Sequence, residues 1–299
     1  MPLTLISHFW NEEFLLPYWL RHHYPLFDHG ILIDYASTDR SCETIRELAP
    51  GWEVRPSANQ WFDAQDADRE VMAVERECPG WKVVLNTTEF LFCEDLRLYV
   101  RRAEQQRKDV AGVWPFDLTM VDRLTERDSE VTEAPLYLQR HFGYHSAGSR
   151  SRLLHRLADG RYDTGRHTSP LVGKRLEDHL FILWFGWCPI RYVRGRKLQI
   201  QSRVSPRDRA AGLGRQHLLT AAQLESAYLR EAGRAHDLLE AHPAYRELVQ
   251  AMGHRHAAAG EMTMPAGALE TARGERPGSE PAACDRTDPS ATLFSGAKR

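Results

Sequence analysis

The sequence predicts an α/β protein with a mostly parallel sheet and helices on both of its faces. In the first half, short apolar runs alternate with amphipathic segments of helical length, which is the pattern of β-α-β units. The run over residues 81–85 is largely apolar, as in a strand at the centre of a parallel sheet. Polar side chains follow directly after three expected strands, where open α/β sheets bind their ligands.

The first predicted strand covers residues 3–9, and a helix reaching about residue 23 follows it. We expect Asn11 to cap this helix, with Glu12 and Glu13 in the first turn, because carboxylates there complement the helix dipole. A second strand over 31–33 ends at Asp34. The next predicted elements are a helix over 42–48, a weaker strand over 52–55, a helix over 67–77 and a strand over 81–85.

The second half is less regular. The predicted elements are a helix over 95–106, a strand over 110–115, an apolar run over 180–187, and helices over 221–239 and 245–252. From residue 254 onward Gly, Pro, Ala and Ser dominate, and we expect disorder. The predicted organisation is therefore a main domain over 1–220, a helical C-terminal extension over 221–253 and a tail over 254–299.

The charge balance argues against a dedicated nucleic-acid binder, because 39 Lys and Arg residues stand against 41 Asp and Glu residues. Only five of the 39 are lysine, so the positive charge is mostly guanidinium, which suits bidentate contacts to phosphate or carboxylate. No apolar stretch approaches the roughly 20 residues that span a bilayer, and residues 1–13 lack the pattern of a signal peptide. We therefore expect a cytoplasmic protein without an integral membrane segment.

The polar residues after the strands resemble a known family. Residues 11–13 read Asn-Glu-Glu, and residues 33–39 read I-D-x-x-S-T-D. This combination resembles the nucleotide-sugar half of a family 2-like glycosyltransferase with a GT-A fold, well over residues 3–93 and more weakly to about 217. The resemblance implies that Asn11, Glu12, Asp34 and Asp39 bind the nucleotide of a nucleotide-diphosphate sugar.

The resemblance includes an altered metal motif. The subgroup usually carries D-x-D-E-F after a strand, and its two aspartates help to hold Mn²⁺ or Mg²⁺. Here residues 86–90 read N-T-T-E-F, so Asn86 and Thr88 replace the aspartates and only Glu89 keeps a carboxylate. Because hard cations favour carboxylates, the change should weaken metal binding.

Three outcomes of this change stay open. A divalent metal still binds through Glu89, the donor phosphates and a downstream histidine such as His167. Alternatively, arginines such as Arg150, Arg152 or Arg166 neutralise the diphosphate without metal. In the third outcome, the protein has lost turnover.

Inverting transfer also needs a general base to take the proton of the acceptor hydroxyl. Family 2 enzymes often place this carboxylate in a Glu-Asp pair just before a helix, and Glu177-Asp178 before the apolar run resembles that arrangement. The resemblance thus implies Asp178 as the base. Alternatively, the two acids are the N-terminal charges of a helix.

A basic segment over residues 196–217 also resembles the subgroup. It contains Gly212 and Gly214, which allow the hinge-like backbone that a lid over a diphosphate needs. The candidate lid or diphosphate residues are Arg207, Arg209, Arg215 and His217. The alternative is a surface loop that does not face the strand ends.

The resulting prediction is an inverting glycosyltransferase that moves a sugar from a nucleotide-diphosphate sugar to a saccharide or small-molecule hydroxyl. A non-catalytic nucleotide-sugar or carbohydrate-binding protein is the alternative, favoured by the missing aspartates. A nucleotidyltransferase would need a glycine-rich loop near the first strand, and residues 5–13 contain no glycine. Trp114, or one of Trp184 and Trp187, is a candidate to stack on an acceptor sugar.

Overall fold

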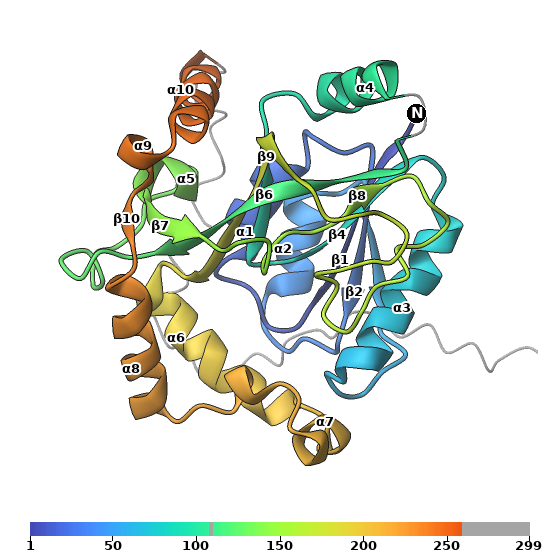
Figure 1. The fold of residues 1–299 in the computed structure, drawn as a ribbon. Coiled ribbons are helices and arrows are strands. Elements are labelled where there is room, and N and C mark those ends of the chain that lie inside the picture. The colour runs from blue at the N-terminus through green and yellow to red at the C-terminus, as the bar shows by residue number, and fades with distance from the viewer. Residues whose placement is uncertain (108–109, 259–299) are drawn as a thin grey trace, which may run out of the picture.

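The computed structural model describes residues 1–107 and 110–258, which form one large twisted sheet with helices around it (Figure 1). Four parallel strands make up one half of the sheet, in the order β4-β1-β2-β3. Their bounds are β1 Leu3–Phe9, β2 His29–Asp34, β3 Glu53–Pro56 and β4 Trp81–Asn86. The predicted α/β class and the predicted strands of this half are confirmed, with boundaries shifted by at most two residues.

Helices cover both faces of the parallel half. They are α1 Leu16–His23, α2 Ser41–Leu48, α3 Ala64–Glu77 and α4 Leu96–Gln106. Alternate residues of β1 point to opposite faces of the sheet. Leu3 and Leu5 therefore belong to the core that includes α1 and α2, whereas Ile6 packs with Val71 and Val74 of α3.

The start of α1 differs from the prediction. Asn11 is not its cap, because its backbone has a φ of 51° and the helix begins at Leu16. The Asn11 side chain instead accepts a hydrogen bond from the Thr38 backbone N–H (2.8 Å) and donates to the Thr38 hydroxyl (3.3 Å). Asn11 thus joins the loops that follow β1 and β2.

The other half of the sheet contains mixed strand pairs. Its strands are β5 Glu89–Phe92, β6 Gly112–Val121, β7 Phe142–His145, β8 Leu154–His155, β9 Leu176–Trp187 and β10 His236–Asp237. The apolar run over 180–187 lies in β9, which pairs with β5 antiparallel and with β6 parallel. Glu177-Asp178 therefore lies within a strand, and the expected helix after the pair is wrong. The physical reason is that β9 is buried on both faces, which favours an uninterrupted apolar strand.

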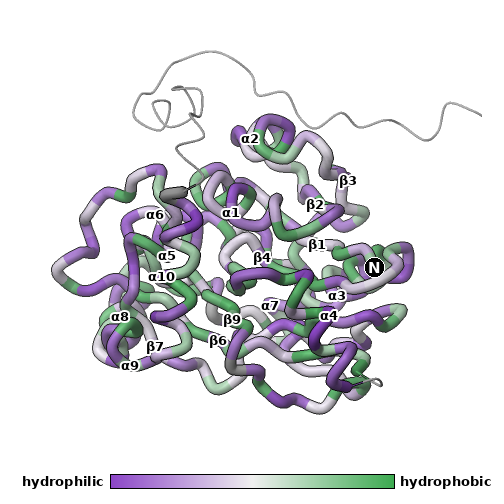
Figure 2. The backbone as a smooth tube through the Cα atoms, turned by 90° about the horizontal axis from the view of Figure 1, so that it is seen from above, coloured by the Kyte–Doolittle hydropathy of each residue, from purple (hydrophilic) through white to green (hydrophobic). Residues whose placement is uncertain are grey.

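The remaining helices follow β6 in the chain. They are α5 Leu136–Gln139, α6 Ile190–Gln199, α7 Pro206–Ala211, α8 Ala221–Ala232, α9 Leu238–Ala241 and α10 Pro243–Ala258, with short 3-10 turns at Ile200–Arg203 and Arg215–His217. Tyr245 of α10 is fully buried in the same core as the sheet, and Tyr228 of α8 packs with Trp187. Figure 2 shows hydrophobic segments along β6 and β9 at the centre of this region.

The helices of the predicted extension thus share their hydrophobic contacts with the main sheet. Helix α10 also continues to Ala258, past residue 254, where the tail was expected to begin. The rest of the predicted tail, residues 259–299, lies outside the described residues. Within the described part, no helix combines the length and hydropathy needed to cross a bilayer.

Candidate functional site

Three polar strand ends meet at one edge of the sheet, as the sequence predicts. Phe9 at the end of β1 is in register with Asp34 of β2, and His8 is in register with Asn86 of β4. A cavity of about 700 Å³ lies at this edge. Its walls come from the ends of β1 and β4, the start of α3, the segments 149–152 and 164–167, the end of β9, and residues 196–219.

Of the four predicted donor residues, Glu12 lines the cavity. Its backbone N–H donates to the hydroxyl of Ser41 (2.8 Å), which fixes the chain after β1. Its buried carboxylate accepts two hydrogen bonds from Nε of Arg196 on α6 (2.6 and 2.7 Å). Glu12 therefore connects the strand end to the helix on the opposite wall.

Asp34 and Asp39 shape the loop beside the cavity. Asp34 is buried and accepts from the Ser37 backbone N–H (2.9 Å), and burial raises the pKa of its carboxyl group. Asp39 accepts from the backbone N–H groups of Glu13 (3.1 Å) and Ser41 (3.0 Å). Among the described lining residues neither aspartate is found, so their contact with a donor stays a prediction.

The altered metal motif lines the cavity through Asn86, Thr88 and Glu89. Glu89 is almost completely buried, and each of its carboxylate oxygens accepts two hydrogen bonds. Oε1 accepts from Asn86 Nδ2 (3.0 Å) and Arg152 Nη2 (2.6 Å). Oε2 accepts from the Asn86 backbone N–H (2.8 Å) and Arg152 Nε (2.8 Å).

This donor set does not fit a divalent cation. The oxygens of Glu89 are committed to a bidentate guanidinium, and Arg152 also donates to Nδ1 of His167 (3.4 Å). Burial first, and then the nearby guanidinium groups of Arg152, Arg150 and Arg166, lower the pKa of His167 to about 2. In residues 1–107 and 110–258 no group of three or more His, Cys, Asp or Glu side chains is placed to hold a metal. The predicted pair of Glu89 and His167 thus lacks the free anionic oxygens that Mn²⁺ or Mg²⁺ prefers.

Arg152 and Arg196 are paired with carboxylates, whereas two other cations of the cavity lie over tryptophan rings. The guanidinium of Arg150 lies 3.9 Å from the ring centroid of Trp184, and Nζ of Lys197 lies 4.1 Å from that of Trp187. Neither side chain has an ion pair or hydrogen bond within the described part of the chain. Burial, followed by the charges of Arg196 and Arg150, lowers the pKa of Lys197 to about 7.

The segment over 200–219 faces the strand ends. This placement differs from the alternative of a surface loop that does not face them. Leu213, Gly214 and His217 line the cavity, and Gly212 and Gly214 adopt positive φ angles of 67° and 66°. Burial and then Arg196 lower the pKa of His217 to about 4.

The three arginines of the predicted lid are placed differently from His217. Arg207 forms ion pairs with Asp63 and Asp66 at the start of α3, and Arg209 donates to backbone carbonyls of its own segment. Arg215 is exposed. The structure thus brings one of the four predicted lid residues into the cavity wall.

The predicted base cannot be placed against the cavity, because the side chain of Asp178 lies outside the described part of the structure. Its neighbour Glu177 accepts hydrogen bonds from Arg107 (3.1 Å) and Tyr99 (3.4 Å). Another buried carboxylate, Asp208 of α7, does line the cavity. Its Oδ2 accepts from the Ala64 backbone N–H (2.8 Å), and its Oδ1 has no partner among the described residues.

Of the three tryptophans predicted as sugar-stacking candidates, two line the cavity and one does not. Trp184 and Trp187 line the cavity, whereas Trp114 is fully buried and donates to the Val172 carbonyl (3.2 Å). Lys197 and Asp208 were not among the predicted site residues. Lysine is rare in this sequence, which draws attention to Lys197. Its position over the Trp187 ring depends on how α6 packs against the end of β9.

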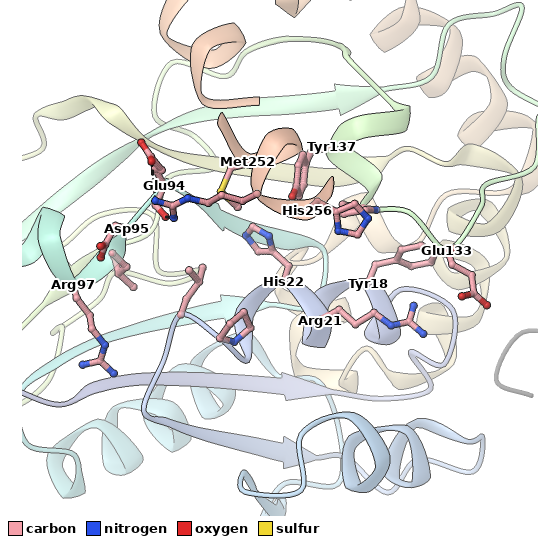
Figure 3. A pocket seen from close by; sticks show the side chains of 15 residues that line it. Tyr18, Arg21, His22, Glu94, Asp95, Arg97, Glu133, Tyr137, Met252 and His256 are labelled. Atoms are coloured by element: carbon pink, nitrogen blue, oxygen red, sulfur yellow. Dashed lines mark hydrogen bonds and ion pairs between the residues drawn. The ribbon is translucent and has the colours of Figure 1, made fainter. Parts of the chain in front are cut away.

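A second cavity of about 550 Å³ lies between α1, the start of α4 and α10 (Figure 3). Two of its arginines are paired, Arg97 with Asp28 and Arg255 with Glu94. None of the predicted site residues is found among its described lining residues.

Comparisons with known proteins gave matches among solved structures alone. No family model and no curated protein matches the chain. Staphylococcus aureus TarS 1-349 has a TM-score of 0.31 at 11% identity, with 52% of this chain and 47% of that chain covered. Glucosyl-3-phosphoglycerate synthase from Mycobacterium tuberculosis, in complex with Mn²⁺ and UDP-glucose, has a TM-score of 0.29 at 15% identity, with coverage of 52% and 56%.

TarS is also matched in its complexes with UDP and with UDP-GlcNAc. The chain spans from 23% to 57% of the lengths of these matched chains. Because the overlap is partial and the TM-scores are about 0.3, these matches do not assign a function to the chain.

Proposed function

We propose that the protein is a glycosyltransferase that moves a sugar from a nucleotide-diphosphate sugar to a hydroxyl acceptor with inversion. The observation that carries this proposal is the placement of Arg150 and Lys197. Both cations lie in a cavity at the carboxyl ends of parallel strands, and neither has an acidic partner in the described chain. Both side chains are half-buried, and a half-buried cation without a counterion favours an anionic ligand.

The chemistry of the transfer matches this placement. As the glycosidic bond breaks, negative charge develops on the leaving diphosphate, and preorganised cations stabilise it. Trp184 and Trp187 supply flat apolar surface next to these cations, which suits stacking against a sugar ring. The proposed acceptor is a saccharide or small-molecule hydroxyl at this surface.

For the donor nucleotide we keep Asn11, Glu12, Asp34 and Asp39 as the proposed binding residues. Glu12 supports this role because it lines the cavity, and Asn11 because it ties the neighbouring loop to the end of β1. A donor bound there would extend its diphosphate toward Arg150 and Lys197.

The proposed base is Asp178, which would accept the proton of the attacking hydroxyl. Asp208 is a second candidate, since it is a buried carboxylate in the cavity wall with one oxygen free of described partners. Asp178→Asn and Asp208→Asn separate the two. The variant that loses transfer while retaining nucleotide binding identifies the base.

A non-catalytic nucleotide-sugar-binding protein is the second candidate function. It is favoured by the commitment of Glu89 to Arg152, which removes the last carboxylate of the metal motif. The same cavity and cations would serve such a protein, so binding alone does not distinguish the two.

One experiment tests both functions. Thermal unfolding is measured with the diphosphates of uridine, guanosine, adenosine, cytidine and thymidine and with their common sugar conjugates, in Mn²⁺, Mg²⁺ or EDTA. Stabilisation together with slow release of the nucleoside diphosphate from its sugar supports the transferase. Stabilisation without sugar release or transfer supports the binding protein, and no response to any nucleotide contradicts both.

A further inference from the structure

The charge balance of the cavity bears on the open question of metal use. Three of its arginines each close a short ion pair with a buried carboxylate. The pairs are Arg152 with Glu89 (2.6 Å), Arg166 with Asp68 (2.5 Å) and Arg196 with Glu12 (2.5 Å). Each pair is neutral as a unit. Arg150 and Lys197 are the lining cations without such a pair in the described residues, and they outnumber Asp208, the lining carboxylate without an ion pair there.

We propose that the diphosphate of the donor is bound without a divalent cation. The guanidinium of Arg152 pairs with Glu89, the one carboxylate left in the altered metal motif, and Arg150 and Lys197 neutralise the phosphates. This inference rests on the proposed function and names how that same site recognises its substrate.

The contacts of Glu89 support the first half of the proposal. A metal ion could reach its oxygens only by displacing Arg152, whose Nη1 also donates to the Gly165 carbonyl (2.5 Å). Displacement would leave a buried guanidinium without its carboxylate, which is costly. The metal would also lie near the unpaired charge of Arg150, which contributes to the lowered pKa of His167, and like charges repel.

The positions of Arg150 and Lys197 support the second half. Both lie near Trp184, with the Arg150 guanidinium 3.9 Å and Lys197 Nζ 5.4 Å from its ring centroid, so together they offer one cation for each phosphate group of a diphosphate. The aromatic faces stabilise the cations without neutralising them. The guanidinium of Arg150 therefore stays charged at neutral pH, and an anionic ligand would favour the charged form of Lys197, whose pKa burial lowers to about 7.

The backbone beside Arg150 is held in place for this role. Asp117 is fully buried, and its carboxylate accepts from the backbone N–H groups of Gly148 (2.7 Å) and Arg150 (2.8 Å). The turn that carries Arg150 is thus fixed before any ligand arrives, as expected for a preorganised anion site.

The first test measures affinity by calorimetry, with the five nucleoside diphosphates in Mn²⁺ and in EDTA. We expect the affinity for the preferred nucleotide to agree within about twofold between the two conditions. Binding in Mn²⁺ alone would overturn the inference and leave the proposed function standing. Binding of no nucleoside diphosphate in either condition would remove the proposed function itself.

The second test uses Glu89→Gln. Metal binding by Glu89 and pairing of Glu89 with Arg152 predict opposite changes in the affinity for the diphosphate. If Glu89 holds a metal, the variant binds the diphosphate more weakly than the wild type in Mn²⁺. In our proposal the variant frees the charge of Arg152, so the affinity in EDTA rises by about threefold or more. A lower affinity, with thermal unfolding showing a folded protein, contradicts the proposal.

The third test leaves the buried ion pairs intact. Lys197→Met should weaken diphosphate binding in EDTA by about tenfold or more, because a charged contact is lost. Arg194→Met is the matched control, since Arg194 is an exposed residue of the same helix outside the described cavity lining. Equal affinities for the two variants, or recovery of the Lys197→Met affinity by Mn²⁺, would overturn the inference.

Discussion

Helix α3 borders two buried polar regions that differ in how their charges are matched. Near its C-terminal end, Glu75 is fully buried, and its carboxylate has its hydrogen-bond partners among the described residues in the segment 155–162. Tyr162 donates its hydroxyl to Oε1 (2.6 Å), His155 Nε2 lies 2.9 Å from Oε1, and the Gly160 N–H donates to Oε2 (2.8 Å). The protein itself satisfies this carboxylate.

The N-terminal end of α3 borders the strand-end cavity, where the balance is incomplete. Asp68 pairs with Arg166, but Arg150 and Lys197 have tryptophan faces and no acidic partner in the described residues. A matched buried charge serves the fold, whereas an unmatched one lowers stability and is retained where a ligand completes it. The contrast separates the structural and functional roles of buried charge in one small protein.

The largest expected effect comes from breaking the matched region. Glu75→Ala removes the shared acceptor of Tyr162, His155 and Gly160, so we expect the free energy of unfolding to fall by about 3 kcal/mol in urea titrations. Nucleotide affinity should stay unchanged because Glu75 lies outside the cavity lining. Glu77→Ala is the control, since the exposed pair of Glu77 with Arg55 should contribute less than about 1 kcal/mol. Equal losses for the two variants would contradict the comparison.

Removing an unmatched charge should have the opposite effect on stability. Burial lowers the pKa of Lys197 to about 7 in the folded protein, so the unfolded chain binds this proton more tightly. Protonation therefore opposes folding below the ordinary lysine pKa, and Lys197→Met should raise Tm by about 2–4 °C at neutral pH. The wild-type protein should regain stability relative to the variant as the pH rises from about 7 to about 10.

Scanning calorimetry over that pH range checks whether the Tm of Lys197→Met lies above or below that of the wild type. Arg194→Met serves again as the control and should change Tm by less than about 1 °C. A Tm of Lys197→Met below that of the wild type at neutral pH would show that Lys197 has a stabilising partner.

The parallel half of the fold could be predicted from the sequence because its signals are local. The strand Leu3–Phe9 has the alternation and length of a buried strand, and its prediction matched to the residue. Local signals also misled: Asn11 is a common cap residue, but its side chain found a partner in Thr38, 27 residues away. The run over 180–187 fits a buried strand as well as a helix, and its pairing with β5 and β6 decides the outcome.

The sequence predicted the location of the site but not the pairing of its charges. Parallel strand ends converge, so the cluster near Asp34 and Asn86 followed from the order of elements. Its charge matching did not follow, because the partner of Glu89 is 63 residues away in Arg152. Lys197 meets Trp187 through the packing of α6 on β9, which the periodicity of either element alone does not reveal.

The smallest expected effect concerns the support of the unmatched charge. Asp117→Asn keeps the shape of the side chain but sets an NH₂ group against one of the two backbone N–H donors of Gly148 and Arg150. The turn should loosen, and diphosphate affinity should fall by about threefold in calorimetry. If Asp117 acts through Arg150, the same substitution in an Arg150→Met background should cause no further loss of affinity, because the positioned group is already absent. An equal loss of affinity in both backgrounds would show that Asp117 does not act through Arg150 and that its role is structural.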